Sequence, residues 1–143
     1  MNFFVKIVAG ILGLGGLWAI FKPKNSPEVD RSNLLPYNNK HKFDDLKSHS
    51  VGIIKKIIKR ESVEGFKIGK TGQPDERTGA NDYENYEKMY LLCQSKSRDT
   101  ISRLESVLND IFFDDLKNQN QKKGSAGTMV SRDGFYYVYV IIF

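Results

Sequence analysis

A glutamate in an apolar setting is the first residue of this sequence that could do chemistry. Glu105 lies four residues after Ile101 and three before Leu108, so in a helix it shares their apolar face. A buried carboxylate is costly unless a metal ion, an arginine or water meets it. Glu105 is therefore a candidate metal ligand. The alternative is an edge position whose carboxylate reaches solvent and pairs with a nearby lysine.

A second segment, GFKIGKTGQPDERTGAND at residues 65–82, combines a predicted strand with glycines and basic side chains. The triplet KIG at residues 67–69 ends the strand, and Arg77 follows eight residues later. This order, with a glutamate on the next helix, resembles the second half of the GIY-YIG nuclease signature, in the branch whose second motif reads KIG. Residues 52–54, GII, stand where the first motif, GIY, belongs, so the resemblance covers residues 51–143.

The resemblance implies phosphodiester hydrolysis of DNA with one divalent cation, Mg²⁺ or Mn²⁺. Glu105 would hold the cation, and Arg77 would neutralise the charge that develops on the phosphate. Lys67 or Lys70 would hold a nonbridging oxygen. The predicted catalytic residues are therefore Arg77, Glu105 and Lys67, and the predicted nucleic-acid-binding residues are Lys67, Lys70 and Arg77.

The first motif departs from the family pattern at its tyrosine. Ile54 occupies that position, and an aliphatic side chain cannot take part in activating water as a tyrosine does. Spacing alone selects none of Tyr83, Tyr86 and His49 as a replacement. The departure favours a domain that has lost its chemistry, whereas the retained arginine and glutamate favour an active enzyme.

Other kinds of site find little support in the sequence. A Walker-type phosphate loop would need a glycine five residues before Gly69, where Glu64 stands instead. His41 and His49 have no partners at zinc-ligand spacing. Cys93 is the only cysteine, which excludes an intrachain disulfide, and its apolar neighbours predict a buried strand residue.

The elements that would position these residues form an α+β domain. We expect a small, mostly antiparallel sheet of three or four strands, with a helix across one face. Hydrophobic periodicity and turn residues place the elements as follows. The predicted strands are residues 51–60 and 66–68, which form a hairpin, then 88–94 and 135–143; the helix begins at Ser97 or Asp99 and ends near Asp114.

The N-terminal segment FFVKIVAGILGLGGLWAIF, residues 3–21, is long and apolar enough to predict a transmembrane helix. Its one charge, Lys6, is near enough to the end to reach the interface. No good cleavage site follows, which favours an uncleaved anchor in the lipid bilayer. Lys22 and Lys24 follow the segment, so the positive-inside rule predicts the C-terminal domain on the cytoplasmic or interior side.

The predicted organisation is a transmembrane anchor at residues 1–22, a polar, proline-containing linker at 23–50 and a GIY-YIG-like domain at 51–143. The net charge of +5 favours anionic partners such as DNA. Two functions stay open. One is a structural or binding component of a membrane-associated or virion assembly, such as a minor capsid protein, with protein partners in that assembly. The other is an active, membrane-tethered DNA endonuclease.

Overall fold

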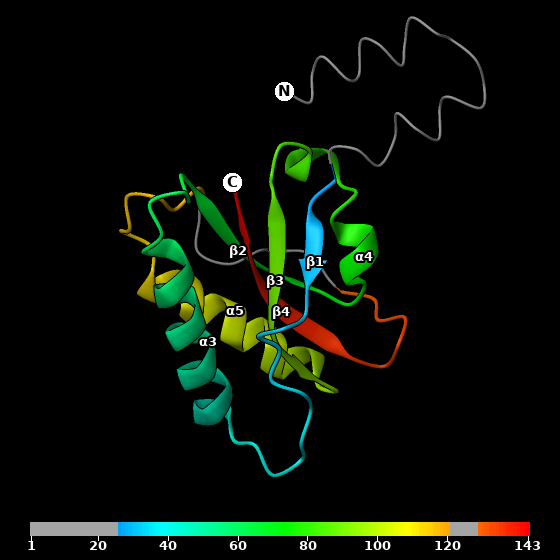
Figure 1. Cartoon of the computed structure of the whole chain (residues 1–143). Helices are drawn as coiled ribbons and strands as arrows, with labels where there is room; N and C mark the ends of the chain where they lie inside the picture. The colour runs from blue at the N-terminus through cyan, green and yellow to red at the C-terminus, as the bar shows by residue number, and fades with distance from the viewer. Residues whose placement is uncertain (1–25, 121–128) are drawn as a thin grey trace, which may run out of the picture.

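A four-stranded mixed sheet forms the centre of the molecule in the computed structural model, which describes residues 26–120 and 129–143 (Figure 1). The strands lie in the order β1-β3-β4-β2, with β1 parallel to β3 and the other two pairings antiparallel. Their bounds are Glu28–Asp30 for β1, Phe66–Thr71 for β2, Lys88–Ser95 for β3 and Tyr136–Ile142 for β4.

Two long helices, α3 at Phe43–Ile58 and α5 at Arg98–Ile111, pack against each other on one face of this sheet (Figure 1). The short helix α4, Pro74–Arg77, and the 3₁₀ turn η2, Asn81–Tyr83, follow β2. Side chains alternate across β4, so its two faces contribute to two separate apolar clusters.

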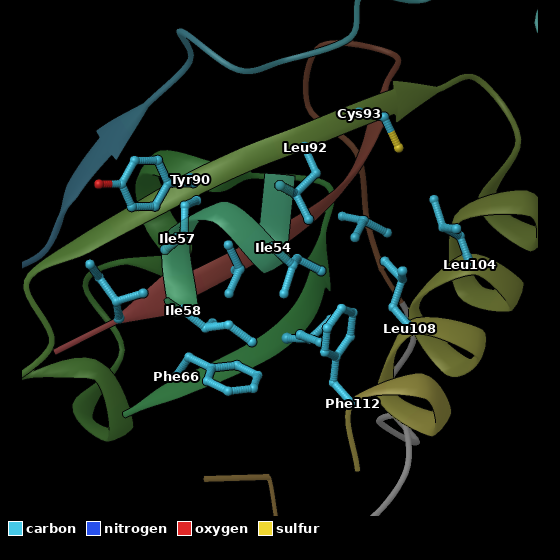
Figure 2. Packing of buried hydrophobic residues seen from close by; sticks show 14 of the residues in the cluster. Ile54, Ile57, Ile58, Phe66, Tyr90, Leu92, Cys93, Leu104, Leu108 and Phe112 are labelled. Atoms are coloured by element: carbon cyan, nitrogen blue, oxygen red, sulfur yellow. The ribbon is translucent and has the colours of Figure 1, made fainter. Parts of the chain in front are cut away.

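The larger cluster fills the space between the two long helices and the sheet. Figure 2 shows Ile54 and Ile57 of α3 in this cluster, together with Leu108 and Phe112 at the end of α5 and Phe66 of β2. The smaller cluster covers the opposite face of the sheet, and its buried members are Tyr83, Met89, Leu91, Tyr137, Tyr139 and Ile141.

Much of the predicted secondary structure is confirmed. Strands begin at Phe66 and Lys88, and the last strand covers most of residues 135–143. Helix α5 begins after Ser97, whose hydroxyl accepts a hydrogen bond from the Thr100 N–H at 3.1 Å, as a helix cap does. Cys93 is buried in β3, also as predicted.

The predicted hairpin strand at residues 51–60 is wrong, because α3 runs through this segment to Ile58. Ile54, Ile57 and Ile58 are all buried, and their spacing is that of one helical face. Burial of that face outweighs the modest preference of isoleucine for strands. The chain then turns at residues 59–65 into β2.

The predicted fold class also needs correction at the N-terminal side. Within the predicted linker, residues 23–50, the structure contains β1 and the first half of α3. Because β1 lies parallel to β3, with Val29 beside Met89, the sheet is mixed and has four strands. Three helices, rather than one, accompany the sheet in the part of the chain that the structure describes.

The prediction of a transmembrane helix, and with it a single-pass membrane location, is corrected as well. Across residues 26–120 and 129–143, no helix combines the length and the apolar character needed to cross a bilayer. The segment for which the span was predicted, residues 3–21, lies outside the described residues.

Candidate active site

A cavity of about 600 Å³ lies along β2, and all four predicted site residues line it. Lys67 and Lys70 come from β2, Arg77 from the end of α4, and Glu105 from the middle of α5. The fold therefore brings together side chains that lie up to 38 positions apart in the sequence, from Lys67 to Glu105.

Glu105 is a buried carboxylate, with 2% of the residue exposed. The Lys70 Nζ lies 3.8 Å from Glu105 Oε1, and the same ammonium donates a hydrogen bond to Ser102 Oγ at 3.3 Å. The side chain of Lys70 is itself only 9% exposed, so the pair is shielded from bulk water. The carboxylate therefore does not reach solvent from an edge position but faces a lysine and the cavity.

Arg77 is held in place by two neighbours that follow it in the chain. Its Nη1 and Nη2 donate to the two carboxylate oxygens of Asp82, at 3.2 and 3.3 Å, and its guanidinium lies 4.3 Å from the centre of the Tyr83 ring. Burial disfavours the charge, but the phenol groups of Tyr139 and Tyr83 and the carboxylate outweigh it, and the pKa of Arg77 is raised. The cation is thus fixed and permanently charged.

Two tyrosine hydroxyls meet at the same cavity. The Oη atoms of Tyr83 and Tyr139 lie 2.6 Å apart, and either one can donate the hydrogen bond. Both side chains are buried, and this burial raises the pKa of both hydroxyls. At neutral pH both therefore keep their protons.

Tyr139 fits the cavity because the residue beside it is a glycine. Gly69 of β2 is the register partner of Tyr139 in β4, and a Cβ added at Gly69 would overlap the Tyr139 hydroxyl and Cζ. A glycine inside a strand often marks such a close approach. Sequence reasoning missed Tyr139. The available signals were this glycine and the alternation that places Tyr137 and Tyr139 on one face.

The predicted first motif does not reach the cavity. Residues 52–54 lie in α3, and Ile54 is fully buried in the larger apolar cluster, as Figure 2 shows. His49 also lies in α3, where its Nε2 is 2.7 Å from the Asn33 carbonyl oxygen. Of the three residues considered as replacements for the tyrosine, only Tyr83 lines the cavity.

Glu105 is the cavity residue that fits the cation implied by the resemblance. Glu105 offers a hard oxygen donor, and no group of three or more His, Cys, Asp or Glu side chains suited to a metal gathers within the described ranges. Magnesium is commonly bound by one or two carboxylates together with water and substrate phosphate. Glu105 would hold such a cation, and Lys70 would have to move aside.

The comparisons identify no relative. No protein family, no curated protein and no solved structure gives a significant match to this chain.

Proposed function

We propose that this chain is a divalent-cation-dependent nuclease of the GIY-YIG type, in which Tyr139 takes the place of the first-motif tyrosine. The observation that carries the proposal is the convergence of Glu105, Arg77 and Lys70 with the hydrogen-bonded hydroxyls of Tyr83 and Tyr139 in one cavity. In this proposal Tyr139 supplies the hydroxyl whose absence at residue 54 favoured a domain without chemistry.

The pairing of the strands supports this assignment. In the resemblance, the strand of the first motif and the strand of the KIG motif form a hairpin. Here β4 is antiparallel to β2 and places Tyr139 opposite Gly69. In this proposal β4 serves as the first-motif strand although it comes last in the chain, and residues 52–54 have no catalytic role.

Each side chain would then act on one phosphate. Arg77, fixed by Asp82, neutralises charge on the phosphate as it develops, and Lys70 and Lys67 donate to nonbridging oxygens. Mg²⁺ or Mn²⁺ bound at Glu105 would supply Lewis-acid stabilisation of the phosphate and the leaving oxygen. As the attacking water transfers a proton to the Tyr139 oxygen, Tyr139 releases its own proton to a nonbridging oxygen of the phosphate, either directly or through Tyr83, which gives up its own proton in turn.

A second candidate is a binding module for phosphate groups that has no catalysis. The observation in its favour is that Lys70 already faces Glu105, so that this carboxylate is balanced by a lysine without a metal ion. The predicted virion setting and protein partners belong with this candidate and stay predictions.

Nicking of supercoiled plasmid tests the proposed function. We expect the full chain to nick plasmid with Mg²⁺ or Mn²⁺ and not with EDTA. Glu105→Gln should remove the activity, whereas Glu61→Gln, at an exposed position outside the cavity, should leave it unchanged. A folded protein that nicks with neither cation, yet binds DNA, would establish the binding module instead.

A further inference from the structure

Four aromatic rings lie in a row that begins in the cavity. The ring centres of Tyr139 and Tyr83 are 6.1 Å apart, those of Tyr83 and Tyr86 are 5.4 Å apart, and those of Tyr86 and Phe143 are 5.0 Å apart. Tyr139 and Tyr83 are buried, whereas Tyr86 and Phe143 are half-buried and can be reached from solvent. The row therefore leads from the cavity to the surface.

Two cations accompany this row. The Arg77 guanidinium lies over Tyr83, and the Lys67 Nζ lies 5.8 Å from the centre of the Tyr83 ring and 5.6 Å from that of Tyr86. Lys67 and Arg77 also line the cavity. Positive charge and ring faces thus alternate along one path, which is the composition of surfaces that bind single strands of nucleic acid.

The outer rings are held in place by the sheet. The Glu87 N–H, next to Tyr86, donates to the Ile142 carbonyl at 2.7 Å, and the Phe143 N–H donates to the Gly65 carbonyl at 3.0 Å. A Cβ added at Gly65 would overlap the Phe143 ring, so the ring lies flush against the backbone. Rings fixed in this way lose little entropy when a base stacks on them.

We propose that Lys67, Tyr86 and Phe143 form a platform for an unpaired strand, so that the substrate of the nuclease proposed above is single-stranded nucleic acid. Bases offer their faces to aromatic side chains only when they are unpaired and unstacked. Lys67 lines the cavity and its Nζ lies 5.6 Å from the Tyr86 ring centre, so it links the platform to the phosphate that is cleaved. This inference rests on the proposed function for the cleavage but not for the binding.

The test is binding of a labelled oligothymidine, single-stranded or annealed to its complement, to the full chain at low salt in EDTA. We expect Tyr86→Ala to weaken single-strand binding about tenfold, or about 1.4 kcal/mol, and to change duplex binding less than about twofold. Tyr86→Phe, which keeps the ring, should bind like the unaltered protein. The matched controls are Tyr37→Ala and Lys96→Gln, since in that exposed pair an ammonium also lies near a tyrosine ring, 5.1 Å from its centre, outside the cavity.

Equal single-strand affinity of Tyr86→Ala and the unaltered protein would overturn the platform, as would an equal loss for duplex. The two proposals can fail separately. If Tyr86→Ala nicks plasmid normally and also binds oligothymidine normally, the platform proposal alone fails. If single-strand binding depends on the Tyr86 ring, but neither plasmid nor the oligothymidine is cleaved when Mn²⁺ is added, the nuclease proposal alone fails.

Discussion

At the scale of single residues, Gly69 makes the position of the Tyr139 hydroxyl possible. The phenol occupies the space above Gly69, where any other residue would place a Cβ. Both residues are buried in the sheet, so neither side can give way without cost. We expect Gly69→Ala to lower the free energy of unfolding by about 1–3 kcal/mol and to reduce nicking at least tenfold, because the phenol is displaced. Gly52→Ala is the control, since a Cβ there meets open space. Equal activity of the two variants would contradict this reading.

The tyrosines also predict how stability depends on pH. Burial raises the pKa of Tyr86 and of Tyr137 to about 12, and it raises those of Tyr83 and Tyr139 as well. Between the unfolded value near 10 and these folded values, the native state binds more protons than the unfolded state, so stability falls as pH rises. The full contribution is present below pH 10 and is lost through about pH 12. Urea unfolding at a series of alkaline pH values measures this slope, which Tyr86→Phe should reduce; a flat profile would contradict it.

At the scale of elements, the α4–η2 segment carries Arg77 and the carboxylate that holds it. In the Arg77–Asp82 pair, 52% of the Asp82 side chain is exposed to solvent. The contribution of the pair to the free energy of unfolding should therefore stay below about 1 kcal/mol. Its effect on catalysis should be larger, because a phosphate-binding cation must be held in one geometry. We expect Asp82→Asn to lower the nicking rate about tenfold without changing the unfolding midpoint. Asp75→Asn breaks a comparable exposed pair with Arg31, at 3.4 Å, and should change neither quantity.

Helix α3 contributes to the larger apolar cluster and not to the cavity. Ile54 is fully buried between α3 and the sheet (Figure 2). Ile54→Ala should lower the free energy of unfolding by about 2–5 kcal/mol, since it removes buried methyl groups and leaves a cavity. The fraction that stays folded should cleave at the normal rate, measured per folded molecule. A large loss of activity without a loss of stability would contradict this, and would indicate that residues 52–54 act as the first motif after all.

At the scale of the whole molecule, the sequence predicted the strands from Phe66 and Lys88, the helix after Ser97 and the final strand, because each has a clear period and clear boundaries. It also predicted four residues that share a cavity: Lys67, Lys70, Arg77 and Glu105. Strand order could not be predicted, since it depends on contacts between distant segments. That order places β4, and with it Tyr139, beside β2, which the spacing of residues along the chain does not reveal.

The isoleucines of α3 led to the wrong prediction of a strand at residues 51–60 for a local reason. Their β-branched side chains favour a strand, and the helical spacing of Ile54, Ile57 and Ile58 competes with that preference. Only the tertiary structure settles this competition, because the helical face becomes buried against β3 and α5. Strand β1 is three residues long and lies in a polar, proline-containing segment, which gives too little pattern for a prediction.

The measurement that tests the central claim most directly compares two tyrosines of one strand. Tyr139→Phe removes the hydroxyl that meets Tyr83, whereas Tyr136→Phe removes a hydroxyl that does not line the cavity. Plasmid nicking by the two variants is measured with excess enzyme and Mn²⁺. We expect Tyr139→Phe to cleave at least about 100-fold more slowly than the unaltered protein, because the group that relays the proton of the attacking water is lost, and Tyr136→Phe to cleave normally. Equal rates for the two variants would contradict the assignment of Tyr139 to the active site.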